Sequence, residues 1–293
     1  MLLLPVICCS PQPSQKDQPA PAREVIDEVG RRVSLPANIE RAVSLAPNLT
    51  EIVFALQAQE SLVGVTSYCD YPEAAKTLEK VGDTLQPNIE RIIGLRPQVV
   101  LVSTASQLEA FTRQLDSHRI AVFVTDPRDL EGVFHSVYQL GQVLNMQQNA
   151  ERLVQNLRSR TAAVEEAVKG YQPVKVFYQL SDEPLYTAGK DSFVTDLIRR
   201  AGGASVTAEV PGAWPRYSAE SALAAQPEAI ILATGGSTGT GNSEVTDSLQ
   251  RSRAVAHGKV FKLNADQLSR PGPRSVDGLE AMARALHPDA FKQ

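Results

Sequence analysis

The sequence predicts an α/β protein of two similar lobes, each built on a parallel β-sheet, connected by a long helix. The chain has 293 residues, which is more than one hydrophobic core usually serves. Its strand-like segments are nearly unbroken apolar runs that alternate with helical patterns, as in parallel sheets covered on both faces. The pattern of residues 90–101, ERIIGLRPQVVL, also recurs as ESALAAQPEAIIL from residue 220. This repeat aligns Glu90 with Glu220 and Pro97 with Pro227, which indicates two units built alike.

The first lobe is expected at residues 23–128. Its start alternates in polarity around Gly30 and predicts a β-hairpin that ends at Pro36. Asn48 and Glu51, three residues apart, have the form of a helix N-terminal cap, and Asn88 is expected to cap a short helix. Strands are expected at 41–47, 61–67, 97–103 and 120–126, and helices at 49–58, 89–95 and 106–118.

Residues 129–170 read as linking helices with a break around Gly141 to Asn145. The second of these helices carries about twenty residues of amphipathic pattern, enough to span roughly 30 Å, so it can cross from one lobe to the other. The second lobe is expected at residues 171–293. Its strands are expected at 174–180, 229–234 and 259–263, and its helices at 191–201, 218–225 and 277–286.

The first 22 residues predict an export signal and a flexible linker. A short apolar run leads to Cys8 and Cys9, and a stretch rich in Pro, Gln and Ser follows. Cys9, or Cys8, resembles the lipidated cysteine of bacterial lipoproteins, whereas the alternative is a frayed terminus. The remaining Cys69 is expected to be a packed thiol. The four histidines lack the spacing of a metal site, and the net charge of -4 without a basic block argues against nucleic acid binding.

The ligand site is expected in the cleft between the lobes. In parallel sheets, ligands bind outside the carboxyl ends of the strands, so the loops that follow the strands should line the cleft. These loops carry Tyr68, Tyr71, Tyr186 and Trp214, the only tryptophan of the chain. Aromatic side chains bury a large area with little loss of entropy, so this set suits a large flat ligand.

Several segments resemble a known family. They are SLAPNLTEIVFAL, GVTSYCDYPEAA, VGDTLQPNIERIIGLRPQVVLV, LYTAGKDSF and VPGAWPRYSAES, and the likeness runs from about residue 24 to 288. They are similar to periplasmic vitamin B12 receptors of ABC importers, within the helical-backbone (class III) substrate-binding proteins for cobalamin, haem and iron-siderophores. The resemblance implies two Rossmann-like lobes joined by a single long α-helix, with the ligand cleft between them.

The resemblance also implies roles for individual residues. Tyr68, Tyr186 and Trp214 match residues that pack on the corrin ring, and Asp266 and Arg270 match its polar contacts. Two positions depart from the pattern, because Thr84 and Ser103 stand where the cobalamin receptor has tryptophans.

Glu90 and Glu220, the glutamates of the internal repeat, match the pair that docks on arginines of the membrane permease. Charged contacts of this kind set orientation and association rate. The alternative for each glutamate is a solvated carboxylate favoured by the helix dipole.

The leading hypothesis is an exported, lipid-anchored and monomeric receptor without catalytic activity or an intrinsic cofactor. It would lie in the periplasm or at the outer face of the cytoplasmic membrane, capture cobalamin or a related corrinoid, and deliver it to an ABC permease. A second hypothesis replaces the corrinoid with haem or a ferric siderophore, whose anionic groups Arg216, Arg270 and Arg274 would meet. A remote alternative is an enzyme that acts on a metal complex, although the sequence has no cysteine cluster, His–carboxylate pair or nucleotide fingerprint.

Overall fold

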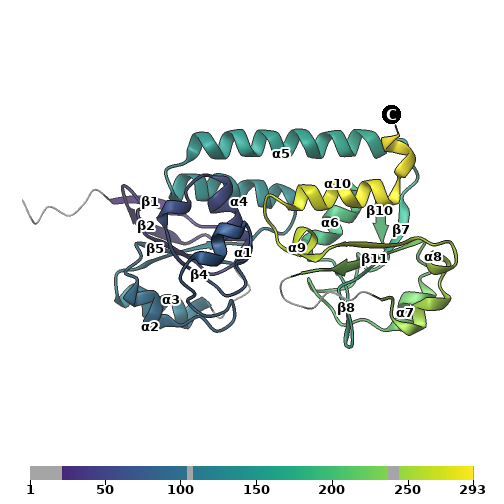
Figure 1. The fold of residues 1–293 in the computed structure, drawn as a ribbon, viewed down its shortest axis with the longest axis horizontal. Helices are drawn as coiled ribbons and strands as arrows, with labels where there is room; N and C mark the ends of the chain where they lie inside the picture. The colour runs from purple at the N-terminus through teal and green to yellow at the C-terminus, as the bar shows by residue number, and fades with distance from the viewer. Residues whose placement is uncertain (1–21, 104–107, 237–243, 293) are drawn as a thin grey trace, which may run out of the picture.

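The computed structural model describes residues 22–103, 108–236 and 244–292. Figure 1 shows two lobes side by side, with α5 (Gln147–Val168) running along one side of both. The expected export segment, with Cys8 and Cys9, lies outside the described residues. Within the described part, no helix is long and apolar enough to cross a membrane.

The first lobe contains a parallel sheet with the strand order β4-β3-β5-β6, preceded by the predicted antiparallel hairpin of β1 and β2. Gly30 allows the hairpin turn because its φ of 82° is strained for other residues. The strands are β1 (Ala22–Ile26), β2 (Arg32–Pro36), β3 (Ala42–Ser44), β4 (Leu62–Val65), β5 (Val99–Ser103) and β6 (Ala121–Thr125). The helices are α1 (Pro47–Ala55), α2 (Ile89–Gly94) and α3 (Leu108–Ser117), with 3-10 turns at Gln59–Ser61 and Glu73–Thr77.

The second lobe contains a parallel sheet with the order β10-β7-β11-β12. When the strands of each sheet are numbered along the chain, both sheets have the same order, 2-1-3-4. The strands are β7 (Val174–Gln179), β8 (Ser181–Asp182), β9 (Leu185–Tyr186), β10 (Gly203–Ser205), β11 (Ala229–Thr234) and β12 (Val260–Asn264). The helices are α6 (Phe193–Arg200), α7 (Ala219–Ala224), α8 (Arg253–Ala256), α9 (Ala265–Ser269) and α10 (Ser275–Leu286), with 3-10 turns at Asp247–Arg251 and Pro288–Phe291.

The internal repeat of the sequence is a repeat of structure. Its two copies form α2 with β5 and α7 with β11, and each of these strands is the third of its sheet along the chain. Asn88 caps α2 and Ser218 caps α7, each accepting a hydrogen bond from the amide three residues further on. Arg96 and Gln226, which directly precede the matched prolines, both have a positive φ, of 48° and 51°. The same local chemistry therefore builds both lobes.

The linking segment consists of α4 (Leu130–Val143) and α5, which are separated by a break where the sequence predicts one. The 22 residues of α5 extend over about 33 Å at 1.5 Å per residue. At the break, Asn145 has a φ of 58°, and its Nδ2 donates a hydrogen bond to the carbonyl of Ala37 at 2.7 Å. Gly141 lets the two helices approach, because an added Cβ would lie 2.5 Å from the Cβ of Ala150.

A continuous hydrophobic cluster connects the lobes. It includes Leu49 in α1 and Phe134 in α4, runs past Leu157 in α5, and reaches Leu197 in α6 and Met282 in α10. Each of these side chains is almost inaccessible to solvent. Because apolar contacts continue from one lobe to the other through α4 and α5, the lobes are held as packed neighbours. The predicted fold class is confirmed, whereas the lobe boundaries at 23–128 and 171–293 stay predictions.

The expected N-terminal cap at Asn48 and Glu51 is wrong. The helix α1 begins at Pro47 with Ala46 as its N-cap, and no side chain caps it. Proline suits the first helical position because it has no N–H that needs an acceptor. Asn48 and Glu51 are buried instead, and both contact the second lobe, where Asn48 Nδ2 donates to the carbonyl of Pro271 at 3.2 Å. The pattern resembles a cap, but tertiary contacts use both side chains.

Candidate functional site

A pocket of about 320 Å³ lies between the lobes, at the carboxyl ends of their strands. Ala46 to Asn48 follow β3, Ser103 ends β5, Leu180 follows β7, and all of them line the pocket. In each sheet, the second strand along the chain lies on one side of the first strand and the third strand lies on the other side. The pocket therefore lies at the points where the strand order reverses, which is where open α/β sheets bind ligands. Its volume is at the lower end of the range for small-molecule sites.

The pocket brings together three of the five predicted ligand-binding residues. Tyr68 contributes from the loop after β4, and Asp266 and Arg270 contribute from α9 and its C-terminal cap. Thr84 and Ser103, the two positions that depart from the cobalamin receptors, also line it. The two positions are therefore in the pocket itself, where small hydroxyl side chains stand in place of the tryptophans that the resemblance implies.

Tyr186 and Trp214 are not among the described residues that line this pocket. Tyr186 belongs to β9 and Trp214 lies on a loop of the same lobe, with 37% of its surface exposed. The ring of Trp214 is tilted by 42° against the ring of Tyr178, with 6.4 Å between centroids. Tyr178 in turn hydrogen-bonds through its hydroxyl to Ser269 Oγ, at 3.1 Å, and Ser269 lines the pocket. Trp214 is thus linked to the pocket through two intervening side chains.

Tyr178 is a residue of the site region that the sequence did not single out. It lies within the apolar run of β7, so its pattern is that of a core residue. It is completely buried, and burial raises the pKa of its phenol well above the ordinary value, although the hydrogen bond with Ser269 opposes this shift. Tyr178 therefore stays neutral and can act as a hydrogen-bond donor or acceptor to Ser269.

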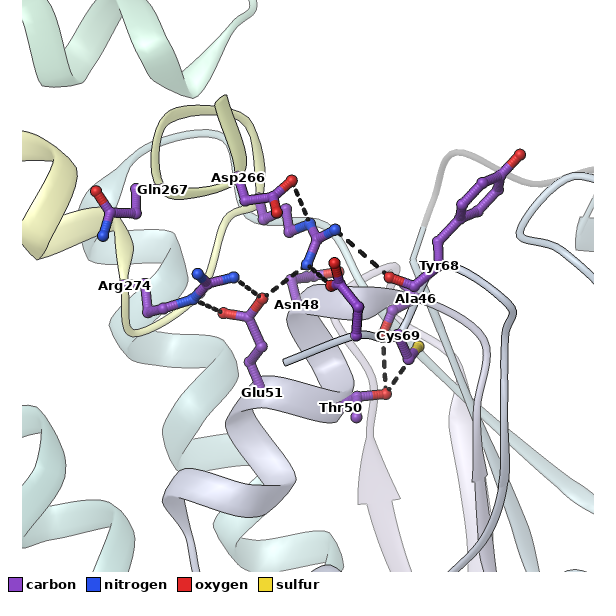
Figure 2. Close-up of polar contacts among 12 residues, drawn as sticks. Ala46, Asn48, Thr50, Glu51, Tyr68, Cys69, Asp266, Gln267 and Arg274 are labelled. Atoms are coloured by element: carbon purple, nitrogen blue, oxygen red, sulfur yellow. Dashed lines mark hydrogen bonds and ion pairs between the residues drawn. The ribbon is translucent and has the colours of Figure 1, made fainter. Parts of the chain in front are cut away.

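A cluster of ionised side chains crosses the interface beside the pocket (Figure 2). Arg270 of the second lobe donates from Nη1 to Asp70 Oδ1 at 2.9 Å and to Glu51 Oε1 at 3.2 Å. Its Nε lies 3.1 Å from Asp266 Oδ1. The carbonyl of Tyr68 accepts a further contact from Nη2 at 3.4 Å, while the ring of Tyr68 points away from the cluster.

Arg274, at the start of α10, forms a bidentate pair with Glu51. Its Nε donates to Oε2 at 2.8 Å and its Nη2 donates to Oε1 at 2.5 Å. The guanidinium also lies 3.9 Å from the ring centroid of Tyr71, in a cation–π contact. Burial lowers the pKa of Arg274, but the hydrogen bonds and the charge of Glu51 outweigh burial and raise it above the ordinary value. Sequence reasoning missed Glu51 and Asp70, because their partners are about 200 residues away or more.

Cys69 is a packed thiol, as predicted. It is buried, and its Sγ lies 3.2 Å from Thr50 Oγ1 and 3.2 Å from Thr66 Oγ1. Thr50 belongs to α1, so these contacts attach the loop after β4 to that helix (Figure 2). The thiol thereby fixes the loop from which Tyr68 and Asp70 reach the interface.

Glu90 and Glu220 occupy equivalent places on the two lobes. Each lies exposed in the first turn of its helix, α2 or α7, and Figure 1 shows both helices on the side of the molecule opposite α5. The hydroxyl of Ser218 donates to Glu220 Oε2 at 2.9 Å. A hydrogen bond from the backbone of Glu220 and that from Ser218 lower the pKa of this carboxylate.

The described residues include no cluster of three or more histidine, cysteine or acidic side chains that could hold a metal ion. The polar groups of the pocket are hydroxyls from both lobes, the amide of Asn48 from the first lobe, and the carboxylate of Asp266 and the guanidinium of Arg270 from the second. Such an arrangement can bind a ligand between two surfaces and orient it.

Comparisons with known proteins agree with this geometry. The periplasmic binding protein family matches residues 42–267. An uncharacterized ABC transporter substrate-binding lipoprotein from Bacillus subtilis is 28% identical to this chain, over 97% of the chain and 94% of the relative. The crystal structure of a periplasmic vitamin B12-binding protein from Vibrio cholerae matches with a TM-score of 0.76 at 28% identity, over 87% of this chain and 99% of that one.

A periplasmic haem-binding protein from Roseiflexus sp. RS-1 matches with the same TM-score of 0.76 at 26% identity, over 86% of this chain and 99% of that one. A binding protein of an ABC transporter has a small-molecule ligand and a membrane permease as partners. The chain therefore belongs to the periplasmic binding protein family, with the two-lobed fold that this family's vitamin B12-binding and haem-binding members share.

Proposed function

We propose that this protein captures cobalamin, or a related corrinoid, in the pocket between its lobes and delivers it to an ABC permease. The observation that carries the proposal is the pocket at the carboxyl ends of both sheets, lined by Tyr68, Asp266 and Arg270. A corrin is a broad apolar plate with amide groups at its edge. It needs ring faces against the plate and polar groups at the rim, and the pocket offers both kinds of group.

In this proposal, Tyr68, Tyr186 and Trp214 pack against the corrin, and Asp266 and Arg270 contact its rim. Trp214 and Tyr68 each have 37% of their surface exposed, so both have apolar area that a ligand can cover. A corrin ring that contacts Trp214 would extend the binding site from the pocket along the second lobe. Ser269 and Tyr178 lie between the pocket and Trp214.

Delivery depends on the other predicted residues. Glu90 and Glu220, one on each lobe, are proposed to dock on the permease, because paired exposed carboxylates on equivalent helices can fix its orientation. The protein is proposed to act as a monomer without catalysis, at the outer face of the cytoplasmic membrane or in the periplasm. Lipidation at Cys9, or at Cys8, is proposed to anchor the protein there. The two lobes are proposed to span residues 23–128 and 171–293.

The second candidate is the same transport role with haem or a ferric siderophore as ligand. Two observations favour it. The haem-binding protein from Roseiflexus superimposes with the same TM-score as the vitamin B12-binding protein. Thr84 and Ser103 also line the pocket with small hydroxyl groups, at positions where the resemblance to cobalamin receptors implies tryptophans.

The test is calorimetric titration of the purified protein with cyanocobalamin, haemin and a ferric siderophore in parallel. Tight one-to-one binding of cyanocobalamin alone supports the proposal. If haemin or the siderophore binds and cyanocobalamin does not, the second candidate is supported. Thr84 and Ser103 would then accompany a ligand that differs from cobalamin. Chemical conversion of any bound ligand contradicts a role without catalysis.

A further inference from the structure

We propose that Glu51 selects ligands by charge: it holds Arg270 and Arg274, so that the pocket favours ligands whose polar rim is neutral over ligands that carry carboxylates. This inference rests on the proposed function, because it names the class of ligand that the same pocket takes. It also makes Glu51, which does not line the pocket, a residue that determines specificity through the two arginines.

The two arginines beside the pocket are already bound to carboxylates. Glu51 accepts hydrogen bonds from both guanidiniums. Its Oε1 binds Arg270 and Arg274, and its Oε2 binds Arg274. Asp70 and Asp266 bind Arg270 from the two lobes, at 2.9 and 3.1 Å. A ligand carboxylate that approaches Arg270 or Arg274 therefore competes with carboxylates of the protein.

The summed charge of the cluster opposes an anion. Three carboxylates and two guanidiniums give a net charge of -1. Glu51 and Arg270 are largely removed from water, with 3% and 9% of their side chains exposed, whereas Asp70 has 32% exposed. A ligand that displaced Glu51 from Arg270 would leave this buried carboxylate with Arg274 as its partner, and breaking a buried ion pair is more costly than the loss of an exposed one. Repulsion of this kind is a common source of specificity.

Neutral amides meet no such barrier. An amide group both donates and accepts, so it can donate to carboxylate oxygens at the pocket wall without replacing an ion pair. Asp266 and Arg270 line the pocket directly, so their outer edges are where such amides would meet the cluster. The rim of a corrinoid carries amides, whereas haem carries two carboxylates on a ring of comparable flatness.

The experiment compares ligands that share a ring and differ in carboxylates. The first pair is cyanocobalamin and a cobalamin monocarboxylic acid, in which one peripheral amide is hydrolysed. The second pair is the dimethyl ester of iron(III) protoporphyrin and haemin itself. Dissociation constants are measured for the full-length protein, for Glu51→Gln and for Glu131→Gln. The last variant is a matched control, because Glu131 pairs with Arg158 at 2.7 Å in an exposed contact between α4 and α5.

The wild-type protein should bind the neutral member of a pair at least about tenfold more tightly than the anionic member. Repulsion between like charges a few ångströms apart can weaken binding by that factor or more. Glu51→Gln should reduce this ratio by about tenfold, and Glu131→Gln should leave it unchanged. If Glu51→Gln fails to fold, Asp70→Asn removes a charge from the same cluster, and it should reduce the ratio in the same direction.

The proposal is overturned if the anionic ligand binds as tightly as the neutral one in the wild-type protein, or if Glu51→Gln and Glu131→Gln give the same ratio. The two proposals can fail separately. A preference for the haem ester without binding of either cobalamin rejects the corrinoid function and keeps the role of Glu51. Equal binding of cyanocobalamin and its monocarboxylic acid keeps the function and rejects the role of Glu51. A protein that binds none of the four ligands overturns both.

Discussion

Replacing Asp196 by asparagine should destabilise the protein by about 2 to 3 kcal/mol, because this carboxylate of α6 holds the N-terminus of α4. Its Oδ2 accepts from the amide of Leu130 at 3.1 Å and from Arg200 Nε at 2.7 Å, and its Oδ1 accepts from Arg199 Nη2 at 2.5 Å. Only 14% of the side chain is exposed. The second lobe is thereby fixed to the first of the two linking helices.

The magnitude follows from the bonds that asparagine can keep. A hydrogen bond to a charged group contributes about 1.5 to 3 kcal/mol. Asparagine retains one acceptor oxygen without charge, so either the helix amide or an arginine loses its partner. Arg200 also pairs with Glu165, which limits the loss on that side. The net loss is therefore close to that of a single charge-assisted bond.

The assay is urea denaturation followed by circular dichroism, with Asp129→Asn as the matched control. Asp129 caps the same end of α4 by accepting from the amide of Gly132 at 2.7 Å. Asparagine is as good an N-cap as aspartate, so this variant should stay within about 0.5 kcal/mol of the wild type. A loss below about 0.5 kcal/mol for Asp196→Asn, or equal losses for both variants, would refute the role of Asp196.

The effect should depend on pH in one direction. Burial raises the pKa of Asp196, but the hydrogen bonds from Arg200, Arg199 and Leu130 together outweigh it and hold this pKa below its ordinary value. A carboxylate with a depressed pKa in the folded state stabilises fully above its unfolded pKa of about 3.9, and this contribution is lost as the pH falls through the folded value. The difference between wild type and Asp196→Asn should be complete at pH 7 and pH 5 and should shrink below about pH 4. An unchanged difference at pH 3 contradicts this account.

Three further changes test the binding surface, the docking pair and the linking helices. Trp214→Ala should weaken ligand binding by about 1 to 3 kcal/mol in calorimetry, as expected for a lost aromatic anchor, and unchanged affinity would remove Trp214 from the site. Reversal of both Glu90 and Glu220 to arginine should stop uptake by cells and leave ligand affinity intact, whereas equal loss of both would assign them to the fold or the ligand. Gly141→Ala should cost about 1 to 3 kcal/mol in thermal unfolding, because its Cβ would meet α5 at 2.5 Å. Gly94→Ala in α2 is its control, since nothing lies within 4 Å of the added Cβ, and it should stabilise by up to about 1 kcal/mol.

Local features of the fold could be predicted because their causes are local in the chain. The turn at Gly30, the cap at Asn88 and the break before α5 depend on neighbouring residues, and the structure has all three. The repeat was visible for the same reason. Its prolines and apolar runs recur because each copy forms a short helix, a tight turn and a buried strand. The two turns also share a positive φ, at Arg96 and Gln226.

The candidate site was only partly predictable. Residues on loops after strands could be assigned to the cleft, and Tyr68, Asp266 and Arg270 do line the pocket. Tyr178 could not be found, because a tyrosine inside an apolar strand has the pattern of a core residue whether or not its hydroxyl reaches a site.

The sequence by itself determined the two α/β lobes, their repeated units and the loops that border the cleft, since hydrophobic periodicity and turn chemistry act over a few residues. Only the tertiary structure decided the use of Glu51. Its spacing from Asn48 is that of a helix cap, but its partners Arg270 and Arg274 are 219 and 223 residues away. A buried carboxylate must find a cation when the lobes meet, and no pattern of neighbouring residues specifies which cation that is.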